Sequence, residues 1–246
     1  MTNWLQKIAL PIKINDKMEE IALKVVQKIN NHKGEKEKEE LIHVDTLDEV
    51  GKRPYYFNFY YTPSNNEWLR GSASTPAWRQ SRDGSGTCNI RLYGKQVDAE
   101  KLRTILHEMI HCIDPKLNKQ NLFEEEWHRK NKGLMNDPAY MSHDHYFTTP
   151  WEQDAYMSSD AHNRISNYKR WGIPYFRVLI EIKNAMPNSK AEDTYYKNPK
   201  LWRKYLKMLS FYLNEIYKKD IPKSKEDSLK IEKDWYDQFD LKRTTV

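Results

Sequence analysis

The sequence predicts an α+β fold, in which a mixed β-sheet packs on one amphipathic helix and a mostly helical portion follows. Three observations support this prediction. Residues 55–61 and 87–93 have the aromatic composition or the alternation of apolar and polar residues that is typical of β-strands. Between Asp98 and Asp114, apolar residues recur at intervals of three and four, as in a helix with one buried face. After residue 174, almost the whole chain has helical periodicity.

The N-terminal part of the chain begins with a predicted helix over residues 15–32. Its apolar residues have helical spacing, and they are Met18, Ile21, Ala22, Val25, Val26 and Ile29. The charged stretch at 32–40 alternates in sign and is interpreted as a solvated turn or a helix end. Residues 62–86 are rich in Pro, Ser, Asn and Gly and predict a long loop before the second strand.

The C-terminal part is expected to be helical throughout. Three segments have apolar residues at three- and four-residue spacing, and they are about 175–186, 199–218 and 224–240. We therefore expect a core at residues 1–170 and a helical portion at residues 171–246, both within one compact domain.

A five-residue motif on the helix after Asp98 carries the chemistry: His107-Glu108-Met109-Ile110-His111, or HExxH. Four residues turn a helix by about 40° more than one full turn, so both imidazoles lie on one face and can share a metal ion. Glu108 lies about 100° further round, where it can reach a water at the metal more easily than the metal itself. The motif predicts zinc bound by His107 and His111, with Glu108 as general base. Two histidines on an ordinary surface helix are the alternative interpretation.

A catalytic zinc site needs a third protein ligand, with water in the fourth position. Our candidate is Glu152, which follows His111 by 41 positions, near the start of a helix with Thr149 as N-cap and Pro150 as first residue. The same residues also form a capping box, in which Glu152 would instead accept a hydrogen bond from the amide of Thr149. The other candidate ligands are Asp154, His143, His145 and the run 124–128.

Taken together, His107-Glu108-x-x-His111 and the later Glu-x-x-Ala sequence from Glu152 to Ala155 resemble the gluzincin group of zinc metallopeptidases, including small phage and bacterial zincin-like peptidases. The resemblance covers roughly residues 97 to 157. It implies a zincin-like fold, in which a mixed β-sheet packs on the HExxH helix, and Glu152 as the third zinc ligand.

The same resemblance implies two further roles. One is a Tyr or His that stabilises the oxyanion; our candidate is Tyr146, and the alternatives are Tyr140, His145 and His162. The other is an aspartate four residues after the glutamate ligand, which orients a histidine. This chain has Tyr156 at that position, and the nearby carboxylates are Asp154 and Asp160.

Other HExxH families fit less well. The third histidine of the metzincin group is absent, because Leu117 stands at its position. Peptide deformylases use a cysteine ligand from an upstream strand, and Cys88 lies on such a strand, but the glycine-rich signatures of that family are missing. With two cysteines, a disulfide framework is not expected, and Cys112 is interpreted as a small buried thiol.

Composition bounds the class of protein. Of the 246 residues 31% are charged, but 16 Tyr, 8 Trp and 7 Phe provide enough apolar surface for a globular fold. The chain contains no apolar run that could span a bilayer and no signal peptide, so we expect a cytoplasmic protein without membrane association, and a phage or viral origin is compatible with it. The net charge of +6 favours acidic partners, yet no nucleic-acid-binding motif is present.

The sequence thus predicts a zinc-dependent endopeptidase, a hydrolase that acts on protein or peptide substrates. One alternative is a zinc-stabilised structural or binding module without turnover. Another is a basic protein associated with nucleic acid. The first two differ in whether the fourth zinc position is open to solvent.

Overall fold

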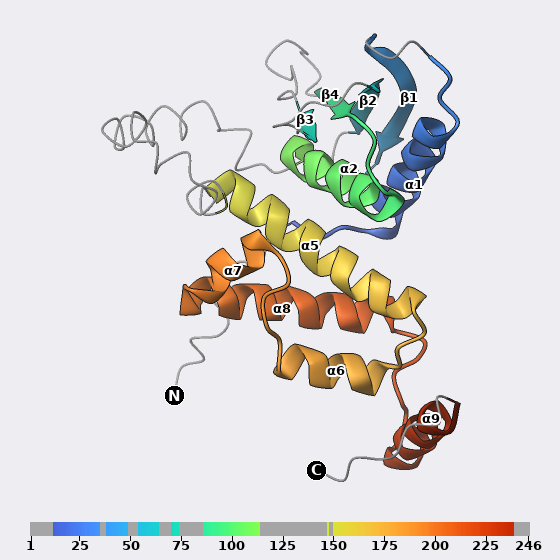
Figure 1. Cartoon of the computed structure of the whole chain (residues 1–246), viewed down its shortest axis with the longest axis vertical. Helices are drawn as coiled ribbons and strands as arrows, with labels where there is room; N and C mark the ends of the chain where they lie inside the picture. Colours follow the sequence, from blue (N-terminus) through green and yellow to red (C-terminus); the bar gives the residue numbers. More distant parts are fainter. Residues whose placement is uncertain are drawn as a thin grey trace. The chain divides into compact units, whose positions relative to one another are not determined.

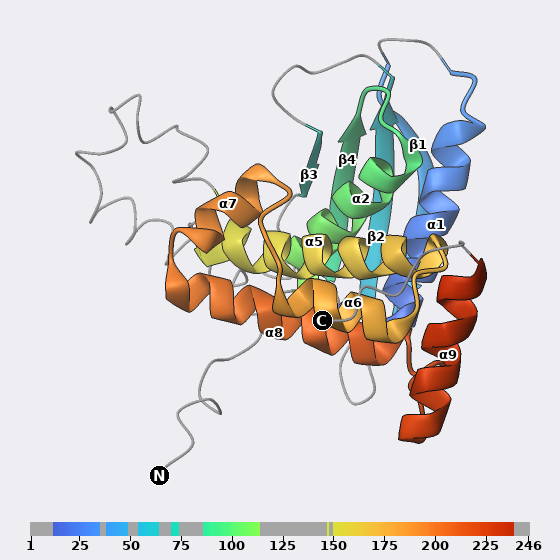
Figure 2. The same cartoon turned by 60° about the horizontal axis from the view of Figure 1, so that its bottom comes forward.

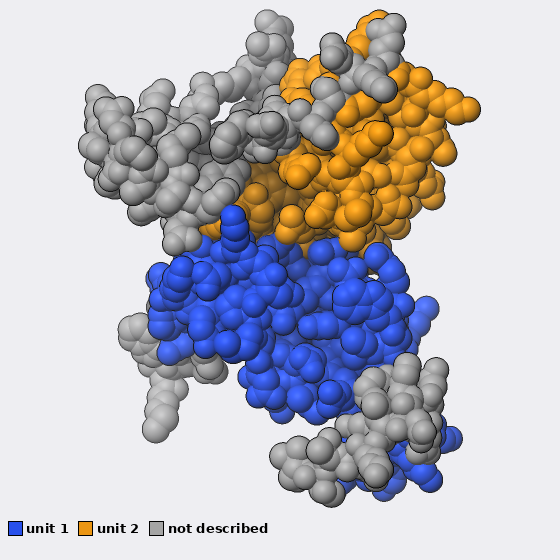
Figure 3. Space-filling view, in the orientation of Figure 1, with its two compact units in different colours: residues 1–10, 160–246 blue, residues 11–159 orange. Residues whose placement is uncertain are grey.

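The computed structural model describes residues 12–34, 38–48, 54–63, 70–73, 86–113, 147 and 150–238. Within these ranges the fold is α+β, with four strands in one mixed sheet and seven helices (Figure 1), which confirms the predicted class. The chain divides into two compact units (Figure 3): the first along the sequence, Pro11–Ser159, is drawn in orange as unit 2, and the second, Asp160–Val246 with Met1–Leu10, is drawn in blue as unit 1. The division lies inside helix α5 (Pro150–Arg170), whereas the helical portion predicted from the sequence begins at residue 171.

The sheet of the first unit has the strand order β1-β2-β4-β3. The strands are β1 (Glu40–Leu47), β2 (Tyr55–Thr62), β4 (Gly86–Tyr93) and β3 (Gly71–Ala73). The central strands β2 and β4 are parallel, and each pairs with its outer neighbour in the antiparallel sense. The sheet is therefore mixed, as predicted.

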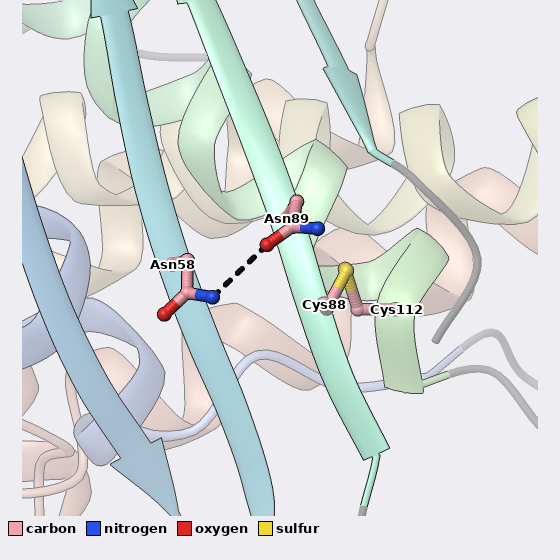
Figure 4. Close-up of a disulfide and its surroundings, with 4 residues drawn as sticks. All are labelled: Asn58, Cys88, Asn89 and Cys112. Carbon is pink, nitrogen blue, oxygen red and sulfur yellow. Dashed lines mark hydrogen bonds between the residues drawn. A yellow bond between two sulfur atoms is a disulfide. The ribbon is translucent and has the colours of Figure 1, made fainter. Parts of the chain in front are cut away.

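Alternation along the two central strands gives the sheet an apolar and a polar face. The apolar face is formed by Phe57, Phe59, Tyr61, Cys88, Ile90 and Leu92, all of which are buried. On the polar face, the amide of Asn58 donates to the side-chain oxygen of Asn89 at 3.0 Å (Figure 4).

Helices α1 (Asp16–Asn30) and α2 (Asp98–Ile113) lie side by side on the sheet (Figures 1 and 2). In α1 all six predicted apolar residues are buried, and Asn15 caps the helix by accepting a hydrogen bond from the amide of Met18 at 2.9 Å. The two helices are joined at the surface, where the amide of Asn30 donates to both carboxylate oxygens of Asp98 at 3.1 Å. The position of α2 is thus fixed by the sheet and by α1.

The second unit is helical. After the C-terminal half of α5 it contains four helices, α6 (Tyr175–Lys183), α7 (Lys190–Tyr196), α8 (Pro199–Ile216) and α9 (Lys225–Gln238). Both α6 and α7 contact α8. No helix in the described ranges is both long and apolar enough to cross a membrane.

A buried carboxylate organises this helical unit. Glu192 accepts hydrogen bonds from the hydroxyl of Tyr205 at 2.6 Å, from Arg164 at 2.8 Å and from the backbone amide of Asn188 at 3.0 Å. Burial of a charge is costly unless the charge is paired and hydrogen-bonded, and these three donors meet that requirement.

Three elements differ from the sequence-based expectations. The prediction of a continuous loop over residues 62–86 is wrong, because β3 forms within it by pairing with β4. Strand β1, which begins at Glu40 where the charged stretch ends, had no predicted counterpart. Neither had the short helix α7. The predicted helices over 15–32, 175–186, 199–218 and 224–240 each contain an observed helix.

A disulfide links the sheet to α2. Cys88 on β4 is bonded to Cys112 on α2, with their Cα atoms 6.0 Å apart, and both residues are fully buried (Figure 4). The expectation of a free thiol at Cys112 is therefore wrong, although its burial is confirmed. Because Cys112 lies on the packing face of the helix, it meets the apolar face of the sheet, where Cys88 is placed by strand alternation.

Reduction of this disulfide should destabilise the protein. The bond closes a loop across a sequence separation of 24 residues, for which chain entropy gives a stabilisation of about 3 kcal/mol. Chemical denaturation of the wild type with and without a thiol reductant measures this difference. The double variant Cys88→Ala/Cys112→Ala should be less stable than the untreated wild type, whether or not the reductant is present. Two free thiols in the unreduced, denatured wild type would contradict the linkage.

Candidate metal centre

Three predicted ligands meet inside the first compact unit. Helix α2 supplies His107 and His111 from positions four residues apart, and the first turn of α5 supplies Glu152. His107 is 6% exposed and Glu152 is 9% exposed, while His111 is half-buried. The structure therefore brings together two imidazoles and one carboxylate, largely shielded from solvent.

The ligand atoms form a small triangle. The two histidine Nε2 atoms are 3.0 Å apart, and Oε2 of Glu152 lies 3.2 Å from Nε2 of His107 and 3.4 Å from Nε2 of His111. In a tetrahedral zinc site with bonds of about 2.0–2.1 Å, neighbouring ligand atoms are separated by about 3.3 Å. The spacing matches one face of such a tetrahedron, so the cluster can hold a metal ion. Among the described residues, this group of three is the one with such an arrangement.

Electrostatics within the cluster favour an ionised Glu152 and a neutral His107. Burial raises the pKa of Glu152, but hydrogen bonds from His107 and His111 outweigh it and hold the pKa far below its ordinary value. Burial lowers the pKa of His107, and the neighbouring His111 lowers it further. Neutral imidazole and ionised carboxylate are the forms that bind metal ions.

Glu108 lies on the same helix but does not belong to the ligand group. It is 6% exposed, and burial is the main reason that its pKa is raised from 4.5 to about 7. His111 lowers this pKa, Glu152 raises it, and the backbone N–H of Ala73 on β3 lowers it by a hydrogen bond. A carboxylate with a pKa near neutrality suits proton transfer at physiological pH.

His107 is oriented by aromatic packing. The ring of Tyr156 lies 4.2 Å from the ring of His107, and Phe147 contacts Tyr156 edge-on at 4.8 Å. Nδ1 of His107 is buried, and no hydrogen bond to it is found within the described ranges. At the position where the gluzincin group has an aspartate, this chain thus places an aromatic ring against the histidine.

The other candidates lie elsewhere. Asp154 is buried but is not in the ligand group. Asp160 and His162 belong to the second unit, where the ring of His162 packs against Tyr212. Cys88 is bonded to Cys112 and is not a ligand in this group. Six further candidates lie outside the described residues: Tyr140, His143, His145, Tyr146, Thr149 and the run 124–128.

Two contributors to the site were not found from the sequence. The amide of Ala73 is a backbone group on a three-residue strand, and no side-chain pattern indicates it. Tyr156 was noted only as a departure from the gluzincin pattern. Its helical offset of four from Glu152, which puts both residues on one face of α5, is a signal that could have placed it beside the histidines.

The raised pKa of Glu108 has a measurable consequence for stability. In metal-free protein, folding keeps Glu108 protonated below about pH 7, whereas the unfolded chain ionises near pH 4.5, so this residue lowers the free energy of unfolding as the pH rises between those values. Glu108→Gln removes this cost. The variant should equal the wild type near pH 4 and exceed it by about 3 kcal/mol at pH 8.

Glu152→Gln is the matched control, because the lowered pKa of Glu152 has the opposite sign. Its ionised form contributes stability above about pH 4.5 that is lost as the pH falls, so the control should be less stable than the wild type at pH 8. Urea denaturation at several pH values, with a chelator present, measures both. A Glu108→Gln variant no more stable than the wild type at pH 8 would contradict the raised pKa of Glu108.

Comparisons with protein-family models, with curated proteins and with solved structures found no match. The relevant features of this centre are three converging ligands and one buried carboxylate that is not a ligand.

Proposed function

We propose that this protein is a zinc-dependent endopeptidase of the gluzincin type. The observation that supports it best is Glu108, a buried carboxylate on the helix of His107 and His111 that does not belong to the three-ligand cluster. A structural metal site uses four protein ligands and has no need of such a group, whereas a hydrolytic site needs both a general base and an open metal position.

The ligand set supports zinc. Two imidazoles and one carboxylate at near-tetrahedral spacing are a known catalytic zinc set. The same three ligand types also bind iron(II) in oxygenases, so ligand identity alone does not select the metal. The HExxH spacing and the unliganded Glu108 favour zinc, because hydrolysis requires a base and no redox chemistry.

The residues of the site have separate roles in the proposed reaction. His107, His111 and Glu152 hold the ion, which when bound supplies a Lewis acid that polarises a carbonyl and acidifies water. Glu108 accepts a proton from the water that attacks the carbonyl carbon. It then delivers this proton to the nitrogen of the scissile amide, and the C–N bond breaks to give a carboxylic acid and an amine, which become carboxylate and ammonium when the acid gives up its proton to the amine.

The position of strand β3 is an argument for a peptide as the substrate. It pairs with β4 along one edge, and no other described strand pairs with it. Such an edge can accept an extended peptide by backbone hydrogen bonding. Because the amide of Ala73 on this strand bonds to Glu108, a peptide held along the strand would place its backbone near the base.

The alternative is a zinc-stabilised module without turnover. It requires a fourth protein ligand, and within the described residues the group has three members. The alternative based on nucleic-acid association has the net charge of +6 in its favour but no supporting site in the part of the chain that the structure describes.

Purified protein should contain about one zinc per chain, and His107→Ala or Glu152→Ala should abolish binding, because two ligands hold zinc far more weakly than three. His162→Gln is the matched control: it also alters a buried histidine, but one in the other unit, and should retain the metal. Elemental analysis for zinc and iron measures both. Metal-free protein whose melting temperature is unaffected by chelators would refute the site, and stoichiometric iron would refute zinc.

Glu108→Gln should retain zinc and fold but lose on the order of 10² to 10⁴ in hydrolysis rate, because Gln keeps the shape and loses the basicity. Glu100→Gln, an exposed glutamate on the same helix, is the control and should keep full activity. New peptide ends in a proteome digest, identified by mass spectrometry, measure the cleavage and identify the substrates at the same time. Equal cleavage by wild type and Glu108→Gln would exclude the mechanism. Zinc binding without any cleavage would favour the structural module.

A further inference from the structure

Strand β3 approaches helix α2 at a residue without a side chain. A Cβ atom at Gly71 would lie 2.7 Å from Cγ2 of Thr104, 3.0 Å from Oε1 of Glu108 and 3.1 Å from Cγ of Glu108. The first of these distances is shorter than a methyl–methyl contact allows, and the other two are tight. The backbone at Gly71 is not in the left-handed region, so space and not conformation requires glycine here.

The start of the strand is fixed by Gln96, which lies just before α2. Its amide nitrogen donates to the carbonyls of Arg70 at 3.2 Å and of Tyr93 at 3.0 Å. Its amide oxygen accepts from the hydroxyl of Thr104 at 3.1 Å. One side chain therefore joins the beginning of β3, the end of β4 and the face of α2 that carries Glu108.

Thr104 precedes Glu108 by one helical turn, so the two side chains lie on the same face of α2. A side chain at Gly71 would meet both, and two residues further along the strand the amide of Ala73 bonds to the carboxylate of Glu108. The strand thus touches Glu108 in two ways, by close packing at Gly71 and by a hydrogen bond at Ala73.

We propose that Gly71 and Gln96 are positioning residues for Glu108. Gln96 holds β3 against α2, and the missing side chain at Gly71 lets the strand approach closely enough for the Ala73 amide to hold the carboxylate in place. The catalytic meaning of this contact rests on the proposed endopeptidase function. The contact itself does not, and the two are tested separately.

The contact is tested by thermal unfolding of metal-free protein, which needs no activity. Gly71→Ala should lower the melting temperature by several degrees. Thr104→Ser removes the nearest atom but keeps the hydroxyl that bonds Gln96, so Gly71→Ala should cost less in that background. It should also cost less in a Glu108→Ala background. Ser72→Ala, on the same strand, is the control and should leave the melting temperature unchanged. Equal losses in all three backgrounds would overturn the proposed contact.

The positioning role is tested on zinc-loaded protein, once a peptide substrate is in hand. Gly71→Ala should lower kcat by about 10- to 100-fold with KM and zinc content unchanged, because a displaced carboxylate still leaves binding and metal intact. Gly71→Ala/Thr104→Ser should recover part of the melting temperature but not kcat, since the approach to Oε1 of Glu108 remains. In a Glu108→Gln background, Gly71→Ala should cause no further loss.

Gln96→Glu provides a second variant. It preserves the size of the side chain and the acceptor for Thr104 but removes both hydrogen bonds to the carbonyls of Arg70 and Tyr93. It should likewise lower kcat and leave zinc content unchanged. If Gly71→Ala and Gln96→Glu both keep the wild-type kcat, the positioning role is wrong while the endopeptidase function stands. If the wild type cleaves nothing, the function fails and the unfolding experiments still decide the contact.

Discussion

Helix α2 is buried on two opposite faces, one apolar and one polar. The site depends on the partners that replace water around the buried groups of the polar face. One face is apolar and packs on the sheet and on α1, where the disulfide from Cys112 also fastens it. The other carries His107 and Glu108, each only 6% exposed. Polar groups that are removed from water destabilise a fold unless partners replace the water. Glu152 provides this compensation for the histidines, and the amide of Ala73 provides part of it for Glu108.

The compensation of Glu108 is incomplete. Glu108 retains a pKa near 7 because its charged form is poorly solvated, and the nearby charge of Glu152 adds to this effect. A divalent ion held by the three ligands would place a positive charge near Glu108 and would lower its pKa. Stability and the proposed chemistry are thus opposed in the metal-free protein: the same buried carboxylate that destabilises the fold is the group able to accept a proton. The anchoring of α2 by sheet, neighbouring helix and disulfide offsets that cost.

Most of the regular structure was predictable because its apolar spacing is long and uninterrupted. Helices α1, α6, α8 and α9 and strands β2 and β4 lie within or close to their predicted ranges. The elements that were missed are short or irregular. Strand β1 has a register shift between Leu41 and His43 that breaks its alternation. Strand β3 is three small residues that form a strand only by pairing with β4, and α7 has seven residues, with an N-cap at Ser189.

The sequence by itself determined the spacing of His107, Glu108 and His111, because helical periodicity puts the two imidazoles on one face and the glutamate beside them. It also singled out Glu152, but only as one of several candidates, since local spacing cannot tell a ligand from a capping residue. The convergence of Glu152 on the histidines, the pairing of Cys88 with Cys112 and the fit of Gly71 against Glu108 were decided by tertiary structure. Each of these contacts joins segments distant in the chain, and their distances depend on how strands and helices pack, which no local pattern encodes.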